Sequence, residues 1–95
     1  MKFAYLILGE NFDPEKDRAA IHGGDARIIG VSSVEEARRE AVRLQAEGID
    51  CIELCGAFGP EGAEYVIRGV ENRIPVGYAV HRPIQDDVFR AVFGE

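Results

Sequence analysis

The segment Cys51-Ile-Glu-Leu-Cys-Gly-Ala-Phe-Gly-Pro-Glu-Gly-Ala-Glu-Tyr-Val66 decides the fold, because an apolar run passes directly into a helix signal through a glycine-rich turn. Residues 49–54 are almost continuously apolar, which is typical of a strand in a parallel sheet that is covered on both faces. The following helix is predicted to begin near Pro60, since proline suits the first turn of a helix. The segment therefore predicts a strand, a tight turn and a helix in succession.

The alternation of strand and helix occurs four times along the chain, with the unit above as the third. Apolar runs predict strands at residues 3–8, 26–31, 49–54 and 76–80. Asp13-Pro14-Glu15 predicts a short helix that ends at Gly23-Gly24, with His22 at its end, and Ser33-Val-Glu-Glu36 is a capping box. Pro83 opens a last helix, whose inner positions are predicted to be Ile84, Val88, Phe89 and Val92.

The spacing of the strands predicts a parallel sheet. Successive strands are separated by roughly a dozen residues or more, the length that a parallel crossover needs. We therefore expect a single α/β domain over residues 1–95, with four parallel strands and helices on both faces. Numbered along the chain, the strands are expected in the order 2-1-3-4. Half of a (β/α)₈ barrel is the alternative, since four strand–helix units are half of eight and two chains would then combine.

The composition excludes several classes of partner. The chain of 95 residues has 17 acidic residues against 11 Lys and Arg, and its net charge is −6. It has no basic run, so nonspecific binding to nucleic acid or to an anionic membrane is not expected. The segment from Lys2 to Leu8 lacks the features of a secretory signal and is interpreted as the first strand. A cytoplasmic location is the expectation that follows.

The two cysteines are interpreted as unpaired. If residues 49–54 form a strand, Cys51 and Cys55 are about 13 Å apart. A disulfide requires Cα atoms within about 7 Å, and a shared zinc ion requires Zn–S bonds of about 2.3 Å. The sequence therefore predicts neither a disulfide between them nor a structural metal site, and no motif identifies a cofactor.

The predicted strand order also places a candidate site. In open parallel sheets, ligands bind beyond the carboxyl ends of the strands, where the strand order reverses. Here that crevice lies between the strands at 3–8 and 49–54. The candidate ligand-binding residues are those of the two turns that follow these strands: Gly9, Glu10, Asn11, Gly56, Ala57, Phe58, Gly59 and Gly62.

The glycine-rich turn has two interpretations. Glycines at 56, 59 and 62 leave backbone N–H groups accessible at the positive end of a helix, which suits a phosphate or a carboxylate. The spacing is neither the dinucleotide fingerprint nor the P-loop, and the turn has no lysine. The alternative is that these glycines only shape a tight turn between a strand and a helix.

Three residues are candidates for catalysis. Glu53 interrupts an apolar strand, so we expect it to be partly buried and to find a partner or take up a proton. Its structural alternative is a pair with Arg27, Lys2 or a tyrosine of a neighbouring strand. Cys55 is a candidate nucleophile with His81 as its base, although a cysteine at the end of a strand is more often a small buried apolar residue.

The run Ile-Glu-Leu-Cys-Gly-Ala-Phe-Gly-Pro-Glu at 52–61 resembles the signature of a small prokaryotic family of domains of unknown function. The resemblance extends over nearly the whole chain and includes the first strand, Asp13-Pro14-Glu15 and Ile74-Pro-Val-Gly77. It implies a compact α/β domain and no particular activity.

Two classes of function remain, with a purely structural role in an assembly as a third. The first, which we favour, is a module that binds a small anionic metabolite at the glycine-rich turn. The second is a small enzyme that uses Glu53 with Cys55 or His81. Because the segment Val88–Phe93 has more apolar residues than one helix face can bury, we also expect a homo-oligomer, with a dimer through the last helix or an edge strand as the favoured form.

Overall fold

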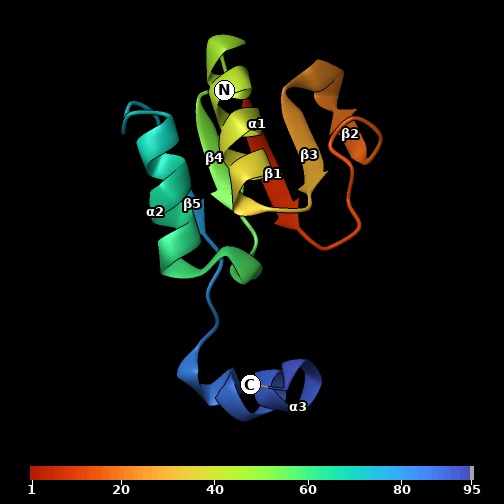
Figure 1. Cartoon of the computed structure of the whole chain (residues 1–95), viewed down its shortest axis with the longest axis vertical. Coiled ribbons are helices and arrows are strands. Elements are labelled where there is room, and N and C mark those ends of the chain that lie inside the picture. The colour runs from red at the N-terminus through yellow and green to blue at the C-terminus, as the bar shows by residue number, and fades with distance from the viewer. Residues whose placement is uncertain (95) are drawn as a thin grey trace.

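A computed structural model describes residues 1–94 and shows a five-stranded sheet with three helices (Figure 1). The strands are β1 (Phe3–Leu8), β2 (Arg18–Ile21), β3 (Ala26–Val31), β4 (Cys51–Leu54) and β5 (Val76–Tyr78). The helices are α1 (Val34–Ala46), α2 (Gly59–Gly69) and α3 (Asp86–Phe93), and the short 3₁₀ turns are η1 (His22–Gly24), η2 (Gly56–Phe58) and η3 (Pro83–Gln85).

The sheet has the order β2-β3-β1-β4-β5, and β1, β3, β4 and β5 are parallel. The predicted order of the four parallel strands is therefore confirmed, with β1 and β4 as central neighbours. The half-barrel alternative is wrong, because strands that follow one another in such a barrel are also neighbours, whereas β3 and β4 are separated by β1.

The first predicted helix is wrong, since residues 18–21 form the edge strand β2, antiparallel to β3. Asp13 does start a helical turn. Its side chain accepts a hydrogen bond from the Glu15 N–H, and its carbonyl accepts one from the Asp17 N–H. The helical turn ends at Asp17. His22, Gly23 and Gly24 have φ values of 53°, 66° and 94°. Residues with positive φ occur in the turns of β-hairpins as well as at the ends of helices. Here the glycine pair lies in the turn that joins β2 to β3.

Because the predicted first helix is absent, one face of the sheet is uncovered. The expectation of helices on both faces is therefore wrong. Helices α1 and α2 lie side by side on the same side of the sheet (Figure 1). The core is formed between these helices and the strand residues that face them. Its fully buried members include Leu6, Ile29, Val31, Leu44, Ile52, Leu54, Val66 and Val70.

Helix α1 begins as its sequence predicts. The Ser33 hydroxyl accepts a hydrogen bond from the Glu36 N–H at 3.1 Å, and the Glu36 carboxylate accepts from the Ser32 N–H at 2.7 Å. The apolar stripe at Ala37, Ala41 and Leu44 is completely buried. The predicted capping box is thus formed, although Glu36 reaches one residue further back than in the standard arrangement.

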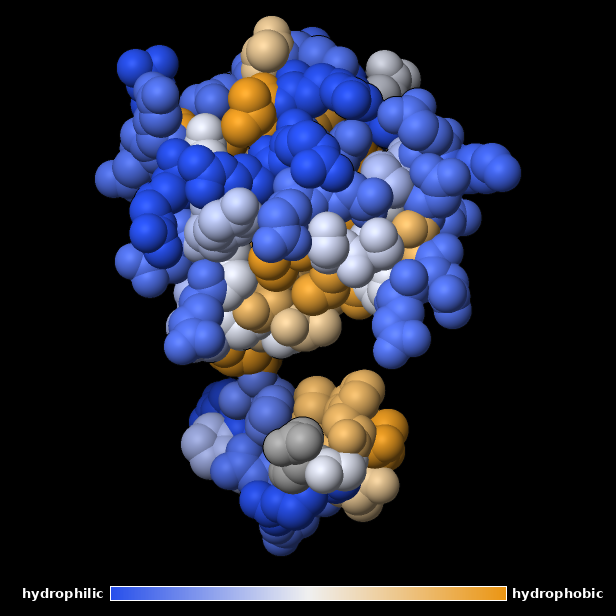
Figure 2. Space-filling view, in the orientation of Figure 1, coloured by the Kyte–Doolittle hydropathy of each residue, from blue (hydrophilic) through white to orange (hydrophobic). Residues whose placement is uncertain are grey.

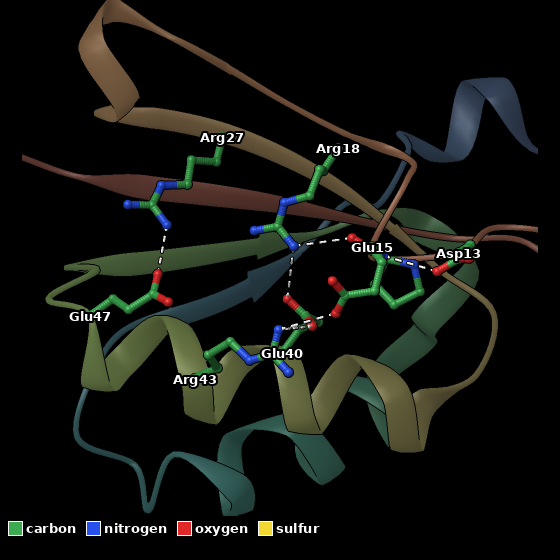
Figure 3. Close-up of polar contacts among 8 residues, drawn as sticks. Asp13, Glu15, Arg18, Arg27, Glu40, Arg43 and Glu47 are labelled. Carbon is green, nitrogen blue, oxygen red and sulfur yellow. Dashed lines mark hydrogen bonds and ion pairs between the residues drawn. The ribbon is translucent and has the colours of Figure 1, made fainter.

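Four charged side chains connect the edge strand to α1 (Figure 3). Glu40 is buried on α1, and its two carboxylate oxygens lie 3.7 Å from Arg18 of β2 and 3.3 Å from Arg43. Arg43 also reaches Glu15, at 3.5 Å. Because the short strand β2 contributes little apolar surface to the core, these ion pairs are its main connection to the helical layer.

The C-terminal segment lies apart from the rest of the molecule (Figure 1). Strand β5 ends at Tyr78, two residues before the predicted end, and every residue from Ala79 to Gly94 is exposed. The predicted inner positions of the last helix are therefore wrong: Ile84, Val88 and Val92 are 86%, 54% and 72% exposed. The segment 79–82, which we call the arm, leads α3 away from the sheet.

Candidate functional site

The candidate site lies at the edge of the sheet where the parallel strands end. Because β1 and β4 are hydrogen-bonded neighbours, the turns that follow them emerge at the same edge. The Cys55 N–H donates to the Leu6 carbonyl at 3.0 Å, which continues the pairing of β1 with β4 up to the glycine-rich turn. The strand order thus brings the two predicted turns to one side of the molecule.

The glycine-rich turn contains two helix starts in succession, η2 and then α2. Neither start has a side-chain cap, in contrast to α1. Gly56 and Ala57 are exposed, whereas the Gly59 N–H is already bonded to the Gly56 carbonyl. Gly59 has φ 63° and ψ −179°, a conformation that is essentially restricted to glycine. Gly56 and Ala57 are therefore the exposed residues at the start of η2, where helix N–H groups lack an intrahelical acceptor.

Two of the predicted ligand-binding residues contribute to packing. Phe58 is only 5% exposed and belongs to the core. Gly62 is buried, and a Cβ atom at this position would lie 3.2 Å from the Phe58 Cβ and 3.5 Å from Val34. Gly62 thus allows the Phe58 ring to lie against the first turn of α2, which fixes the shape of the exposed part of the turn.

The turn after β1 is held by an aromatic ring. The Phe12 N–H donates to the Gly9 carbonyl, and the Phe12 ring lies across Gly9 and Gly30. Glu10 and Asn11 are exposed at the tip. Among residues 1–94 no hydrogen bond joins this tip to the glycine-rich turn, so the two turns share an edge without direct bonding.

Glu53 is exposed, which corrects the expectation that it is partly buried. It points to the face of the sheet that lacks helices, so no second layer covers it. Its carboxylate lies over Gly77 of β5, where a Cβ atom would be 3.2 Å from Oε1. In the described part of the chain Glu53 has no hydrogen bond or ion pair. Of the expected partners, the Arg27 guanidinium pairs with Glu47. The bond between Lys2 and Asp50 is made by the main-chain N–H of Lys2.

Cys55 and His81 have separate partners. The Cys55 Sγ accepts a hydrogen bond from the Leu8 N–H at 3.3 Å, and both cysteines are free. His81 lies on the arm, where its Nε2 is 2.8 Å from Asp86 and its ring stacks on Phe89 at 3.9 Å. Residues 1–94 contain no hydrogen bond between Cys55 and His81.

We expect the His81→Ala variant to leave the alkylation rate of Cys55 unchanged, because His81 is bonded to Asp86 and not to the thiol. Labelling with iodoacetamide, followed by mass spectrometry of the peptide with Cys55, measures this rate near neutral pH. Cys51 serves as the internal reference. A rate that falls severalfold in the variant would contradict the expectation and would restore the nucleophile–base pair.

Sequence reasoning missed a groove between α1 and α2, which is lined by Glu35, Arg38, Arg39, Val42, Arg43 and Tyr65. Its volume is about 510 Å³, and the Arg38 guanidinium lies 4.6 Å from the centre of the Tyr65 ring. Sequence spacing places the arginines on the outer face of α1. Only the packing of α2 shows that they share a hollow with an aromatic ring, so no sequence signal marked it.

A sequence profile described as "Family of unknown function (DUF6506)" matches residues 1–94. The chain belongs to this family. The match includes the glycine-rich turn, the arm and α3, so the exposed C-terminal segment is part of the DUF6506 domain. Searches of curated proteins and of solved structures found no match.

Two further observations concern the described residues of this DUF6506 domain. Within residues 1–94, no group of three or more His, Cys, Asp or Glu side chains is arranged to bind a metal ion. Over the same residues, no helix has the length and apolar character needed to cross a bilayer.

Proposed function

We propose that this domain binds a small anionic molecule at the glycine-rich turn, beyond the carboxyl ends of β1 and β4. The observation that carries the proposal is the pair of successive helix starts without side-chain caps. The first N–H groups of a helix have no intrahelical acceptor, and the helix dipole adds a partial positive charge there. The N–H groups of the exposed residues Gly56 and Ala57 are the donors that a phosphate or carboxylate would use.

The position of the turn also supports the proposal. It lies beside the central pair of strands, where the order of the sheet reverses and where open α/β sheets bind their ligands. The conformation of Gly59 fixes the path between η2 and α2, so the donors are arranged before a ligand arrives. An ordered donor set reduces the entropic cost of binding.

Glu61 gives the proposal a sharp test, because it places a negative charge in the first turn of α2. The Glu61→Gln variant removes that charge without disturbing the core, since Glu61 is exposed. We expect it to strengthen the binding of inorganic phosphate by about 2- to 5-fold, in line with typical charge–dipole energies. Glu64→Gln is the matched control, because it makes the same change of net charge one turn away.

The measurement is a phosphate titration followed by amide chemical shifts, with chloride at equal ionic strength as the reference. The N–H signals of Gly56, Ala57 and Glu61 are expected to move together with one affinity, and Gly59→Val is expected to abolish this response while the domain stays folded. Shifts restricted to residues of the α1–α2 groove, and lost in Arg39→Ala, would place the anion there instead. No specific shift in the parent or in Glu61→Gln would refute the proposal.

A further inference from the structure

The uncovered face of the sheet carries rows of apolar side chains, as the strand register shows. Paired residues of neighbouring strands point to the same side, so Ile21, Ala26, Phe3 and Cys51 form one row. The next residues on this face are Ala19, Ile28, Tyr5 and Glu53. The alternate residues of these strands, among them Ala4, Leu6 and Ile29, are fully buried beneath the helices.

The members of these rows on β1, β2 and β3 line a shallow hollow on the surface, whereas Cys51 and Glu53 of β4 lie outside it. The hollow has a volume of about 280 Å³ and lies over β1, β2 and β3. Phe3 and Ile28 are each 40% exposed and Ile21 is 70% exposed. Mostly parallel sheets are normally covered on both faces, so a sheet with this apolar face lacks one layer.

Helix α3 and the preceding turn η3, which contains Ile84, carry apolar side chains that stay exposed in the described part of the chain. Ile84, Val88 and Val92 follow one another at intervals of four residues, and Phe89 and Phe93 form a second line beside them. Phe93 is 70% exposed and Phe89 is 37% exposed. Figure 2 shows apolar side chains gathered on one side of the C-terminal segment. An isolated helix of eight residues is not stable in water, so α3 requires a surface to pack on.

We infer that α3 of one chain packs on the uncovered sheet face of a second copy, and that the second copy returns its own α3 in the same way. Within one chain the two surfaces stay apart, because the arm continues beyond β5 and carries α3 away from the sheet (Figure 1). A helix of eight residues is about 12 Å long, and three strands span about 10 Å between the outer two. The helix therefore matches the width of the hollow.

The surface area that this exchange of helices would bury is sufficient for a stable dimer. Two phenylalanines bury about 300–500 Å² per helix, and two helices on two sheet faces bury on the order of 1,200–2,000 Å², the size of a standard specific interface. The valines of α3 compensate for the part of Phe89 that is already covered. The edge strands are less suitable for association, since β2 and β5 have only four and three residues.

The first test is the mass of the full chain by sedimentation at micromolar concentrations. We expect a dimer in the parent, and a dissociation constant at least tenfold higher in Phe93→Glu and in Ile28→Glu. Both side chains are exposed in the single chain, and circular dichroism checks that each variant is folded. Asp87→Lys, on the polar side of α3, is the control and is expected to remain dimeric.

The second test distinguishes a second copy from a helix that folds back on its own sheet. Cys51 lies in the apolar row, so Val92→Cys in a Cys55→Ser background places the second thiol on α3 and keeps both phenylalanines. A short bismaleimide is expected to produce a covalent dimer.

Four outcomes would overturn the inference. They are a monomeric parent, a cross-link formed only within one chain, a dimer that survives Phe93→Glu, and a larger assembly that both surface variants dissociate. The last of these would exclude the two-fold arrangement.

Discussion

The Leu6→Ala variant is expected to lose about 2–5 kcal/mol of unfolding free energy, the usual cost of truncating a fully buried leucine. Leu6 lies in the central strand, with Ile29 and Leu54 beside it, and all three side chains are completely buried. A domain of this size has a total stability of roughly 5–15 kcal/mol, so the variant loses a large part of it. Because α1 packs on this strand, the cavity is not expected to collapse easily.

Urea unfolding at one fixed protein concentration measures this loss, since any self-association adds to the apparent stability. Val42→Ala is the control, because Val42 is 44% exposed on α1 and its truncation is expected to stay within about 0.5 kcal/mol. Similar midpoints for the two variants would show that the helical layer does not pack on β1 as described.

The Arg18→Ala variant is expected to lose about 1–3 kcal/mol, because it leaves the buried Glu40 carboxylate with Arg43 alone. Glu40 Oε1 already lacks a hydrogen bond, so it depends on the Arg18 guanidinium. The same guanidinium also donates to the Pro14 carbonyl at 3.1 Å. The truncation therefore releases the loop before β2 as well as the ion pair.

Arg27→Ala is the matched control for this prediction, since Arg27 pairs with the exposed carboxylate of Glu47 and such pairs contribute about 0–1 kcal/mol. In the Arg18→Ala, Glu40→Met double variant, most of the lost stability is expected to return, because the methionine buries no charge. Thermal unfolding of the four proteins measures these differences. If Arg18→Ala and Arg27→Ala lower the melting temperature equally, Glu40 does not anchor β2.

The parallel part of the fold could be predicted because its signals are local and unambiguous. Ser33 and Glu36 mark the start of α1, and the distance between apolar runs excludes hairpins between the parallel strands. Strand β2 could not be predicted in this way. Asp13-Pro14-Glu15 begins a helical turn in either case, and His22-Gly23-Gly24 fits a hairpin as well as a helix end. The difference depends on pairing with β3, which no local pattern contains.

The candidate site was predicted less completely than the fold, for the same reason. The location of the glycine-rich turn follows from the strand order, which the sequence spacing indicates. The exposure of Glu53 depends on whether a helix covers the second face of the sheet. Its burial was expected because its neighbours in the strand are apolar, and that local pattern does not show which face is covered. The periodicity of α3 identified its apolar residues, but it contains no information about which chain they contact.

The arm has a consequence for the kind of assembly that the chain can form. It has four residues and spans at most about 14 Å, so it limits where the helix of one molecule can lie on the next. If that reach allows the exchange to be mutual, two molecules close on each other and growth stops. A lengthened or stiffened arm would allow each molecule to reach a third one, and the same contacts would then propagate as an open chain. In the proposed dimer, the length of the arm between β5 and η3 would thus keep the assembly from growing beyond two molecules.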